Sequence, residues 1–412
     1  MGQNYPTTRF PFRPETTPFY AVSTVPRFPH DFDTASVRGG PRGAQLARSH
    51  SGQWWWLSTI KEPQVICAVQ GVDATVGTEP ADSQVKRWGF NLLMPATAPA
   101  FLRKGAAHVE DLALGHVGPA LVREEGVLLP DVFDSSWSES VEQRINGIQP
   151  VAGLVGWTSD SEGRWGGWAE ETAPLPRPGL LQICLGLDPA FRAYHSAWDF
   201  VLARHGGEFA TVASDWGVRL SGRGAARQMT RDEQIIDTPG YRRDLVDFIR
   251  EYAQRYFSSV RSAARQINPD CLLLSPLLSA STPPPVREIA ANQCDLVLVG
   301  ALDLIESEGP QLWCVSDWAD PIAEVDPQSG EGHFERRLRH GRERIVAGLR
   351  HPRVIGYSWG RFRRGDLAVG DPFSAGLVDE NGRSNDALVQ PLSSINAVAG
   401  QLRSSAAVRS PA

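Results

Sequence analysis

Several features that define large classes of protein are scarce or missing in this 412-residue chain. No apolar run approaches the roughly 20 residues that span a bilayer, and the first residues, MGQNYPTTRF, lack the apolar core of a secretory signal. Lys and Arg number 41 against 47 Asp and Glu, and no basic run is interleaved with aromatic residues. We therefore expect neither a membrane nor a nucleic acid as partner. Localisation stays open between the cytoplasm and a secreted or periplasmic site reached with a signal that has since been removed.

Metal and disulfide signals are also missing. The five cysteines lie mostly in short apolar runs such as CLLLSPLL and show neither pairing nor ligand spacing, which predicts free buried thiols. No cluster of His, Cys and carboxylate residues has metal-ligand spacing, and no glycine-rich phosphate loop follows the first predicted strand. We predict no catalytic metal and no cofactor.

Tryptophan, in contrast, is abundant, with 13 residues against 7 tyrosines. Indole rings stack on sugars, but they also fill protein cores, so composition alone leaves both interpretations open. The hydrophobic content of 42% is sufficient for a large core.

Short apolar runs alternate with helical patterns along most of the chain. Such runs separated by amphipathic helices indicate a parallel sheet covered by helices. The clearest helix is 241–267, where apolar residues recur every three or four positions. The pattern predicts an α/β fold of the (β/α)8 TIM-barrel type, rather than a doubly wound open sheet. The eight predicted strands are 64–72, 89–94, 109–117, 151–159, 271–278, 294–302, 311–317 and 353–359.

The domain organisation follows from these elements. Residues 1–50, rich in Pro, Arg, Gly and Thr, are predicted to be an arm packed on the barrel, and GQWWWL with the following segment is predicted to be a hairpin that leads into the first strand. Residues 51–412 form the barrel, with an insertion at about 163–240 after the fourth strand. Barrel enzymes build substrate sites from such loops, so we expect substrate contacts there, including Trp165 and His195.

Polar side chains at the predicted strand ends are the candidate functional residues, because chemistry in this fold lies at the carboxyl ends of the strands. Acids on strands four and seven would face each other across the barrel mouth, as glycoside cleavage requires. A single acid at a strand end is more commonly a loop cap or salt-bridge partner, and only the matching pair favours catalysis. The candidates are Asn91, His116, Asp160, Glu162, Asp303, Asp317 and Trp359.

A set of segments in a fixed order resembles the retaining clan-A glycoside hydrolases, and most closely the family 50 β-agarase-like barrels. The resemblance covers most of the chain from about residue 50, and GQWWWL is similar to that family's opening hairpin. The segments are VKRWGFNLL, LPDVFDSSWSESVEQRI, VAGLVGWTSDSEGRW, DFIREYAQRYFSSVRSAARQINPDCLLLSP, CDLVLVG and VIGYSWGRFRRGD with the later AGLVDENGR.

The resemblance implies roles for individual residues. Glu162 matches the glutamate of the family's TDNE motif and would be the general acid/base, whereas Asp317 of VSDW stands where the family has a glutamate nucleophile. Ser161 replaces an asparagine that typically binds the sugar 2-hydroxyl. Further substrate-site residues are implied or predicted as follows: Asp160 from the same motif, Asn91 from GFN, Trp318 from VSDW, Trp359 as an aromatic floor, and Trp157 and Trp165 as an apolar wall. For Trp359 the alternative is a barrel-core residue, for Asn91 a strand-end cap, and for His116, His195 and Asp303 a structural role.

The aspartate in the nucleophile position has a physical consequence. Retaining enzymes hold their carboxyl groups about 5–5.5 Å apart, and one methylene less moves the oxygens to about 6.5–7 Å, the lower edge of the inverting range. Retention with a backbone shift is favoured over an inverting enzyme and over a carbohydrate-binding barrel that no longer cleaves. The resemblance implies a β-linked, galactose-containing oligo- or polysaccharide as substrate, and a homo-oligomer remains compatible with the sequence.

Overall fold

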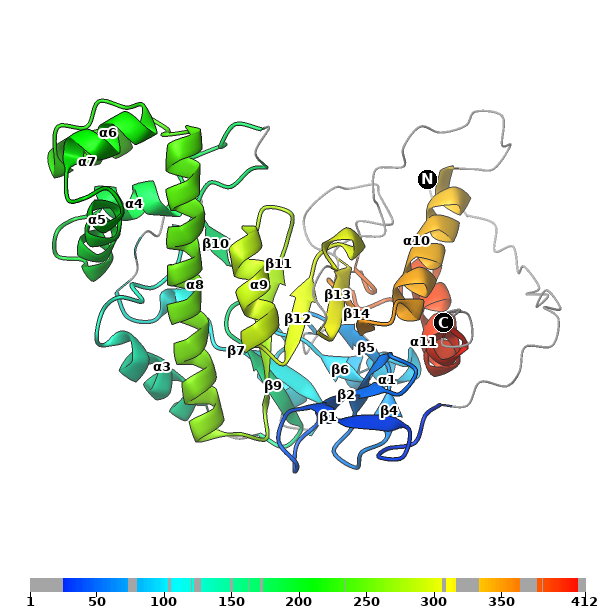
Figure 1. The fold of residues 1–412 in the computed structure, drawn as a ribbon. Helices are drawn as coiled ribbons and strands as arrows, with labels where there is room; N and C mark the ends of the chain where they lie inside the picture. The colour runs from blue at the N-terminus through cyan, green and yellow to red at the C-terminus, as the bar shows by residue number, and fades with distance from the viewer. Residues whose placement is uncertain are drawn as a thin grey trace.

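A closed barrel of eight parallel strands forms the centre of the molecule, with helices around it (Figure 1). The predicted TIM-barrel fold is therefore confirmed, and each barrel strand overlaps one of the eight predicted runs. The strands are β5 (Ile66–Val69), β6 (Leu92–Leu93), β7 (His108–Asp111), β9 (Leu154–Thr158), β11 (Leu272–Leu278), β12 (Leu296–Val299), β13 (Gln311–Val315) and β14 (Val354–Trp359). The computed structural model describes residues 25–72, 80–102, 105–119, 121, 127–148, 151–161, 163–170, 173–232, 234–305, 309–315, 333–363, 376–379 and 381–406.

Two apolar cores lie on the two faces of this barrel. Successive side chains of a strand point to opposite faces, so alternate residues fill the interior while the others meet the helices. On β5, for example, Ile66 and Ala68 belong to the interior cluster, whereas Cys67 and Val69 belong to the outer one. This alternation decides which strand-end side chains can reach a ligand at the mouth.

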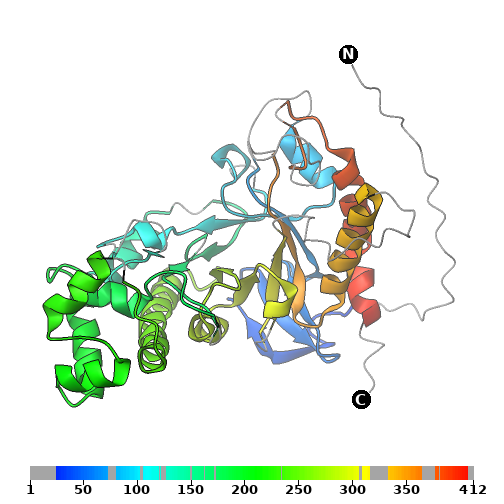
Figure 2. The same ribbon diagram turned by 90° about the horizontal axis from the view of Figure 1, so that it is seen from above.

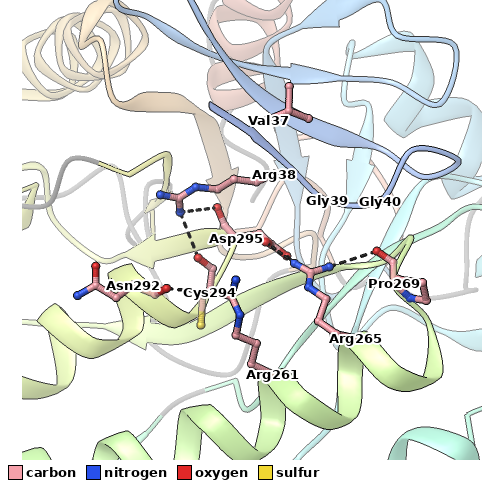
Figure 3. Close-up of a pocket in the computed structure, with 10 residues that line it drawn as sticks. All are labelled: Val37, Arg38, Gly39, Gly40, Arg261, Arg265, Pro269, Asn292, Cys294 and Asp295. Atoms are coloured by element: carbon pink, nitrogen blue, oxygen red, sulfur yellow. Dashed lines mark hydrogen bonds and ion pairs between the residues drawn. The ribbon is translucent and has the colours of Figure 1, made fainter. Parts of the chain in front are cut away.

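A four-stranded antiparallel sheet closes the amino-terminal end of the barrel. It consists of β1 (Phe32–Arg38), β2 (Gln45–Ser49), β3 (Trp54–Leu57) and β4 (Pro63–Gln64). Trp54 and Trp56 join the interior cluster of the barrel, and Arg38 donates hydrogen bonds to the carbonyls of Cys294 and Asp295 (Figure 3).

The hairpin prediction is confirmed by β3 and β4, which lead directly into β5. Residues 32–49, within the predicted arm, contain two strands of this sheet, β1 and β2. Strand β1 reads FDTASVR, which has too few apolar residues to reveal a strand in the sequence alone.

The longest helix, α8 (Pro239–Ile267), confirms the helix predicted at 241–267. It starts with Thr238, whose side chain accepts a hydrogen bond from the Tyr241 amide, and with Pro239 in its first turn. Within the described residues no helix is both long and apolar enough to cross a membrane. The remaining elements around the barrel are α1 (Ala81–Arg87), α2 (Pro99–Leu102), η1 (Leu114–His116), β8 (Val127–Leu128), α3 (Trp137–Asn146), β10 (Arg164–Trp165), α9 (Pro284–Gln293), η2 (Leu302–Leu304), α10 (His333–Arg350) and α11 (Asp386–Ala406).

Most of the insertion after the fourth barrel strand is helical. Its helices are α4 (Leu180–Gly186), α5 (Arg192–Arg204), α6 (Phe209–Trp216) and α7 (Arg223–Arg231). They lie on the side of α8 that faces away from the barrel strands (Figures 1 and 2). Trp198 and Trp216 are fully buried and belong to the large outer apolar core. These helices of the insertion are thus remote from the barrel axis (Figures 1 and 2).

All five cysteines are free thiols, as predicted, and all but the half-buried Cys314 are buried. Burial raises the pKa of Cys67 and of Cys271 to about 12. Their thiols therefore stay protonated at neutral pH and have little nucleophilic character.

Candidate functional site

The two acids expected to perform the chemistry, Glu162 and Asp317, lie outside the described residues, and so does Trp318. Their described neighbours in the chain are Ser161 and Gly163 on one side of the barrel and Val315 on the other. The described part of the candidate site consists of the strand ends that lead into these segments.

The strand register shows which polar side chains face the barrel axis at its carboxyl end. Val109 belongs to the interior cluster, so Asp111, two residues further along β7, points inward, and its register partner Thr158 on β9 does too. On the other side, Ser358 of β14 pairs with Cys314 of β13, which packs against the interior cluster. The floor of the mouth thus carries a carboxylate and two hydroxyl groups.

Asp111 is a candidate site residue that the sequence analysis missed. Its Oδ1 accepts a hydrogen bond of 2.8 Å from the Ala113 amide, and its Oδ2 accepts one from the Ser161 hydroxyl. Because Ser161 directly precedes Glu162, Asp111 fixes the chain at the point where it enters the predicted acid/base residue. The sequence carries no clear signal for this position, because the inward direction of Val109 and Asp111 is known only from the structure.

Asp160 is buried, with 7% of its surface exposed. Its Oδ1 accepts a 2.8 Å hydrogen bond from the Gly115 amide, and its Oδ2 accepts one from the Tyr256 hydroxyl on α8. Burial raises the pKa of Asp160 to about 7; the charge of Asp111 also raises it, while the two hydrogen bonds act in the opposite direction. Both oxygens are thus engaged by the protein, and the geometry points to a positioning role for Asp160 beside the mouth.

An aromatic cluster stands behind Asp160. Trp165 stacks on Phe257 at 6.2 Å between ring centroids. It forms T-shaped contacts with Tyr252 and Tyr256. Trp137 stacks on Tyr256 from α3 at 5.8 Å. Trp165 is only 3% exposed and packs onto α8 as part of this apolar cluster.

The expectation that Trp157 and Trp359 line the mouth needs correction. Trp157 pairs with Leu273 and Trp359 pairs with Val69, and all four belong to the outer cluster between strands and helices. Because paired residues of parallel neighbours point to the same face, both indoles point away from the barrel axis. They are 3% and 2% exposed, respectively, and fill the barrel–helix layer, which is the barrel-core alternative for Trp359.

Asn91 is also placed away from the carboxyl end of its strand. It precedes β6, and its amide accepts a 2.9 Å hydrogen bond from the Cys67 amide and donates one of 2.9 Å to the Val65 carbonyl. Its side chain thus bonds the backbone around β5 near the amino-terminal side of the barrel. This is the strand-end cap that was the alternative interpretation for Asn91.

The two candidate histidines lie in different surroundings. His195 is on α5, where its Nε2 lies 2.8 Å from the Pro189 carbonyl oxygen and its ring meets Tyr194 edge to face. His116 is exposed at the end of η1, next to the Gly115 amide that binds Asp160. His116 is therefore close to the candidate site, whereas His195 belongs to the helical insertion outside α8.

Asp303 lines a groove at the mouth end of the molecule. The groove has a volume of about 1060 Å³ and runs between the amino-terminal ends of α8 and α9, which follow the carboxyl ends of barrel strands. The half-buried Trp168, from the first part of the insertion, lines the same groove. An indole, carboxylates and guanidinium groups on one concave surface form a surface of the kind that binds sugar rings and hydroxyls. Other lining residues include Glu170, Arg242, Pro284, Arg287 and Glu288.

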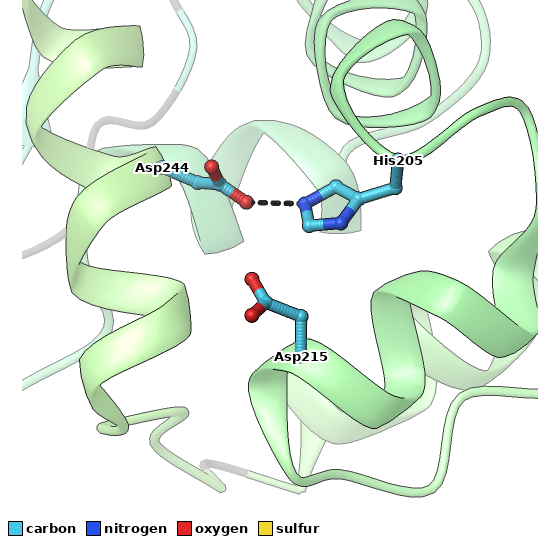
Figure 4. A group of neighbouring side chains, drawn as sticks. All are labelled: His205, Asp215 and Asp244. Atoms are coloured by element: carbon cyan, nitrogen blue, oxygen red, sulfur yellow. Dashed lines mark hydrogen bonds and ion pairs between the residues drawn. The ribbon is translucent and has the colours of Figure 1, made fainter.

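A second polar cluster lies on the insertion side of α8, where single ligand atoms of His205, Asp215 and Asp244 fall within 4.8 Å of one another (Figure 4). Asp244 is already bonded to His205 Nε2 at 2.7 Å and to Arg204 Nε at 2.9 Å. Arg243 pairs with Asp215 at 2.9 Å. Because guanidinium groups compensate both carboxylates, we interpret the cluster as an ion-pair network that fastens α5 and α6 to α8.

Comparison with solved structures finds the same fold in the agarase-type barrels that the sequence motifs resemble. The chain matches an exo-β-agarase with a TM-score of 0.65 and 14% identity, over 89% of this chain and 66% of that one. It matches a protein named BpGH50 with a TM-score of 0.66 and 13% identity, over 89% and 84%. For the agarase AgWH50C the values are 0.64, 14%, 88% and 66%. The chain thus spans about two thirds of the length of the two agarases. No protein-family model and no curated protein sequence matches it.

Proposed function

We propose that the protein is a glycoside hydrolase that cleaves a β-linked, galactose-containing oligo- or polysaccharide. The observation that carries the proposal is the closed barrel in which β9 and β13 lead, at the same end, into Glu162 and Asp317. The similarity of fold to agarases over most of the chain supports it. A fold hosts many activities, so the two acids, and not the barrel, define the reaction.

In the proposed reaction, protonated Glu162 gives its proton to the glycosidic oxygen as the bond to the leaving sugar breaks. Ionised Asp317 attacks the anomeric carbon and forms a glycosyl ester. Glu162, now ionised, removes a proton from water, and the resulting hydroxide displaces Asp317 from the sugar. Retention is favoured; with the shorter aspartate, direct attack by a water between the two groups is the inverting alternative.

Asp111 and Ser161 take the place of the missing asparagine in this proposal. An asparagine amide at position 161 would supply a donor to the sugar 2-hydroxyl, whereas the Ser161 hydroxyl donates to Asp111. The half-buried Asp111 carboxylate then accepts a hydrogen bond from a sugar hydroxyl at the mouth. The groove with Trp168 and Asp303 holds sugar units further from the cleaved bond.

A second candidate is a carbohydrate-binding barrel that has lost turnover. The specific observation that favours it is the combination of Ser161 and Asp317 in positions where the resembled family has asparagine and glutamate. Both departures weaken interactions that act on the transition state, while the groove beside the mouth would still bind sugar.

Product analysis on β-galactans, agar and porphyran oligosaccharides and β-glucans tests the proposal. We expect cleavage by the wild type, loss of cleavage in Glu162→Gln, and unchanged cleavage in Glu139→Gln, an exposed glutamate of α3. Labelling of Asp317 by a fluoro-sugar supports retention, and an inverted anomer in NMR spectra contradicts it. Glycan binding without any cleavage by the wild type would refute the hydrolase and favour the second candidate.

A further inference from the structure

A charged hollow lies at the amino-terminal end of the barrel, opposite the mouth. It has a volume of about 420 Å³ and lies between the end of β1, the last turns of α8 and the turn from α9 into β12 (Figure 3). Three arginines from two elements converge on it: Arg38 from the closing sheet, and Arg261 and Arg265 from α8. Asp295 is the only carboxylate among its lining residues.

This single carboxylate forms an ion pair with one of the three arginines, Arg265. Both oxygens of Asp295 accept hydrogen bonds from Arg265, and Oδ2 also accepts one of 2.8 Å from the Leu273 amide. Within the described residues, neither Arg38 nor Arg261 forms an ion pair with a carboxylate. The lining residues therefore carry three guanidinium groups against one carboxylate, an excess of two positive charges.

The remaining bonds of Arg38 and Arg261 use only part of each guanidinium. Arg38 Nη1 donates to the Cys294 and Asp295 carbonyls at 3.1 and 3.2 Å. Arg261 Nη1 donates to the Asn292 and Gln293 carbonyls at 3.3 and 2.7 Å. Since a guanidinium has five N–H donors, Nε and Nη2 of both arginines have no hydrogen-bond partner in the described part of the chain.

The positive charge of Arg261 also disfavours the charged form of Arg38. Burial lowers the pKa of Arg38; the charge of Asp295 partly offsets this, and the smaller effect of Arg261 lowers the pKa further. An anion between the two guanidinium groups would offset this repulsion and accept hydrogen bonds from the unused N–H groups. Arg38 also lies over the Trp54 ring, 5.2 Å from its centroid, but this contact and the bonds to carbonyls leave the excess positive charge of the hollow in place.

We propose that this hollow binds a tetrahedral oxyanion of the sulfate or phosphate type, either as the free ion or as an ester group of a polysaccharide. The planar forks of two arginines match the oxygens of such a group, and charge-assisted hydrogen bonds to it are short and strong. The site is remote from the mouth, and the proposal does not depend on the hydrolase activity.

Calorimetric titration of the full chain at constant ionic strength tests the site, with sulfate, phosphate and a sulfated and a neutral galacto-oligosaccharide as probes. We expect saturable binding of sulfate or phosphate that is weakened about tenfold or more in Arg261→Gln, the loss of roughly one charge-assisted interaction. Arg261→Lys, which keeps the charge but not the fork, should bind with intermediate affinity. Arg255→Gln removes an exposed charge from the same helix and should bind like the wild type.

The outcomes separate the sources of the anion. Tighter binding of the sulfated oligosaccharide than of free sulfate assigns the site to a sugar ester, and equal or weaker binding assigns it to the free ion. Circular dichroism confirms that each variant is folded before titration. The proposal is overturned when the wild type shows no saturable oxyanion binding, or when Arg261→Gln binds as tightly as the wild type. Equal weakening in Arg261→Gln and Arg255→Gln also overturns it, because that result indicates non-specific charge attraction.

Discussion

Asp160 connects the mouth of the barrel with the helical layer through one side chain. Its two oxygens bind the Gly115 amide and the Tyr256 hydroxyl, and it stands two residues before the predicted acid/base Glu162. The carboxylate is held in a site with little solvent, so its protonation is linked to folding. This linkage gives the position a measurable signature that does not require any substrate.

Asp160→Asn should change how stability depends on pH. The pKa of Asp160 is raised from 3.8 to about 7, so between these values the folded protein keeps a proton that the unfolded chain has released. The free energy of unfolding contributed by this group therefore falls as pH rises, by about 1 kcal/mol per pH unit, between roughly pH 4 and 7. Asparagine cannot ionise, so the variant lacks this pH-dependent contribution to the free energy of unfolding.

Urea unfolding of wild type and Asp160→Asn at pH 5, 6, 7 and 8 measures the effect. The variant should gain stability relative to the wild type from pH 5 to 7 and keep that difference at pH 8. Asp303→Asn, at an exposed strand-end aspartate, controls for the loss of a charge. Parallel stability curves for wild type and Asp160→Asn would show that burial does not raise this pKa.

At the scale of elements, the barrel strands could be predicted because most of them lie in nearly continuous apolar runs; β7, which reads HVED, is the exception. Whether each side chain points to the barrel interior or to the helices could not be predicted from the sequence. The pairing of β13 with β14 contains a register shift between Gln311 and Leu312, and such an irregularity changes which residues point inward. Trp359 was therefore placed on the correct strand but on the wrong face.

The same limit explains why Asp111 was missed. Residues 109–117 are apolar enough to be predicted as one strand, but β7 ends at Asp111 and Ala113 adopts a left-handed conformation with φ of 50°. Only this early turn places Asp111 at the strand end, beside Ser161. A local backbone conformation of a non-glycine residue has no clear signal in the sequence.

Gly156 of β9 illustrates how closely neighbouring strands approach in this barrel. A Cβ atom at this position would lie 2.4 Å from the Leu272 carbonyl oxygen of the adjacent strand. Gly156→Ala should lower the free energy of unfolding by about 2–3 kcal/mol, because backbone must move to admit the methyl group. Gly300→Ala, where the nearest atom is at 3.4 Å, should cost clearly less. Chemical denaturation of both variants measures the difference, and equal losses would contradict it.

For the whole molecule, the structure separates functions that the sequence places together in the insertion. Trp168 lines the groove at the mouth end, whereas His195 lies on α5, beyond α8. The ion-pair network of Asp244 fixes that helical part to α8. The first residues of the insertion are thus available to a bound polymer, and the helices after them support α8 from outside.

Kinetics with substrates of different length test this separation. Trp168→Ala should raise KM about tenfold for long oligosaccharides, because a lost aromatic stacking contact costs about 1–1.5 kcal/mol. Its effect on the shortest cleaved substrate should be small, since that substrate occupies the mouth and not the groove. His195→Ala should leave KM and kcat unchanged for both, because its ring bonds to Pro189 within the insertion. A KM increase in His195→Ala with none in Trp168→Ala would indicate that the polymer binds the helical insertion and not the groove. An equal KM increase for short and long substrates in Trp168→Ala would place Trp168 at the cleaved bond.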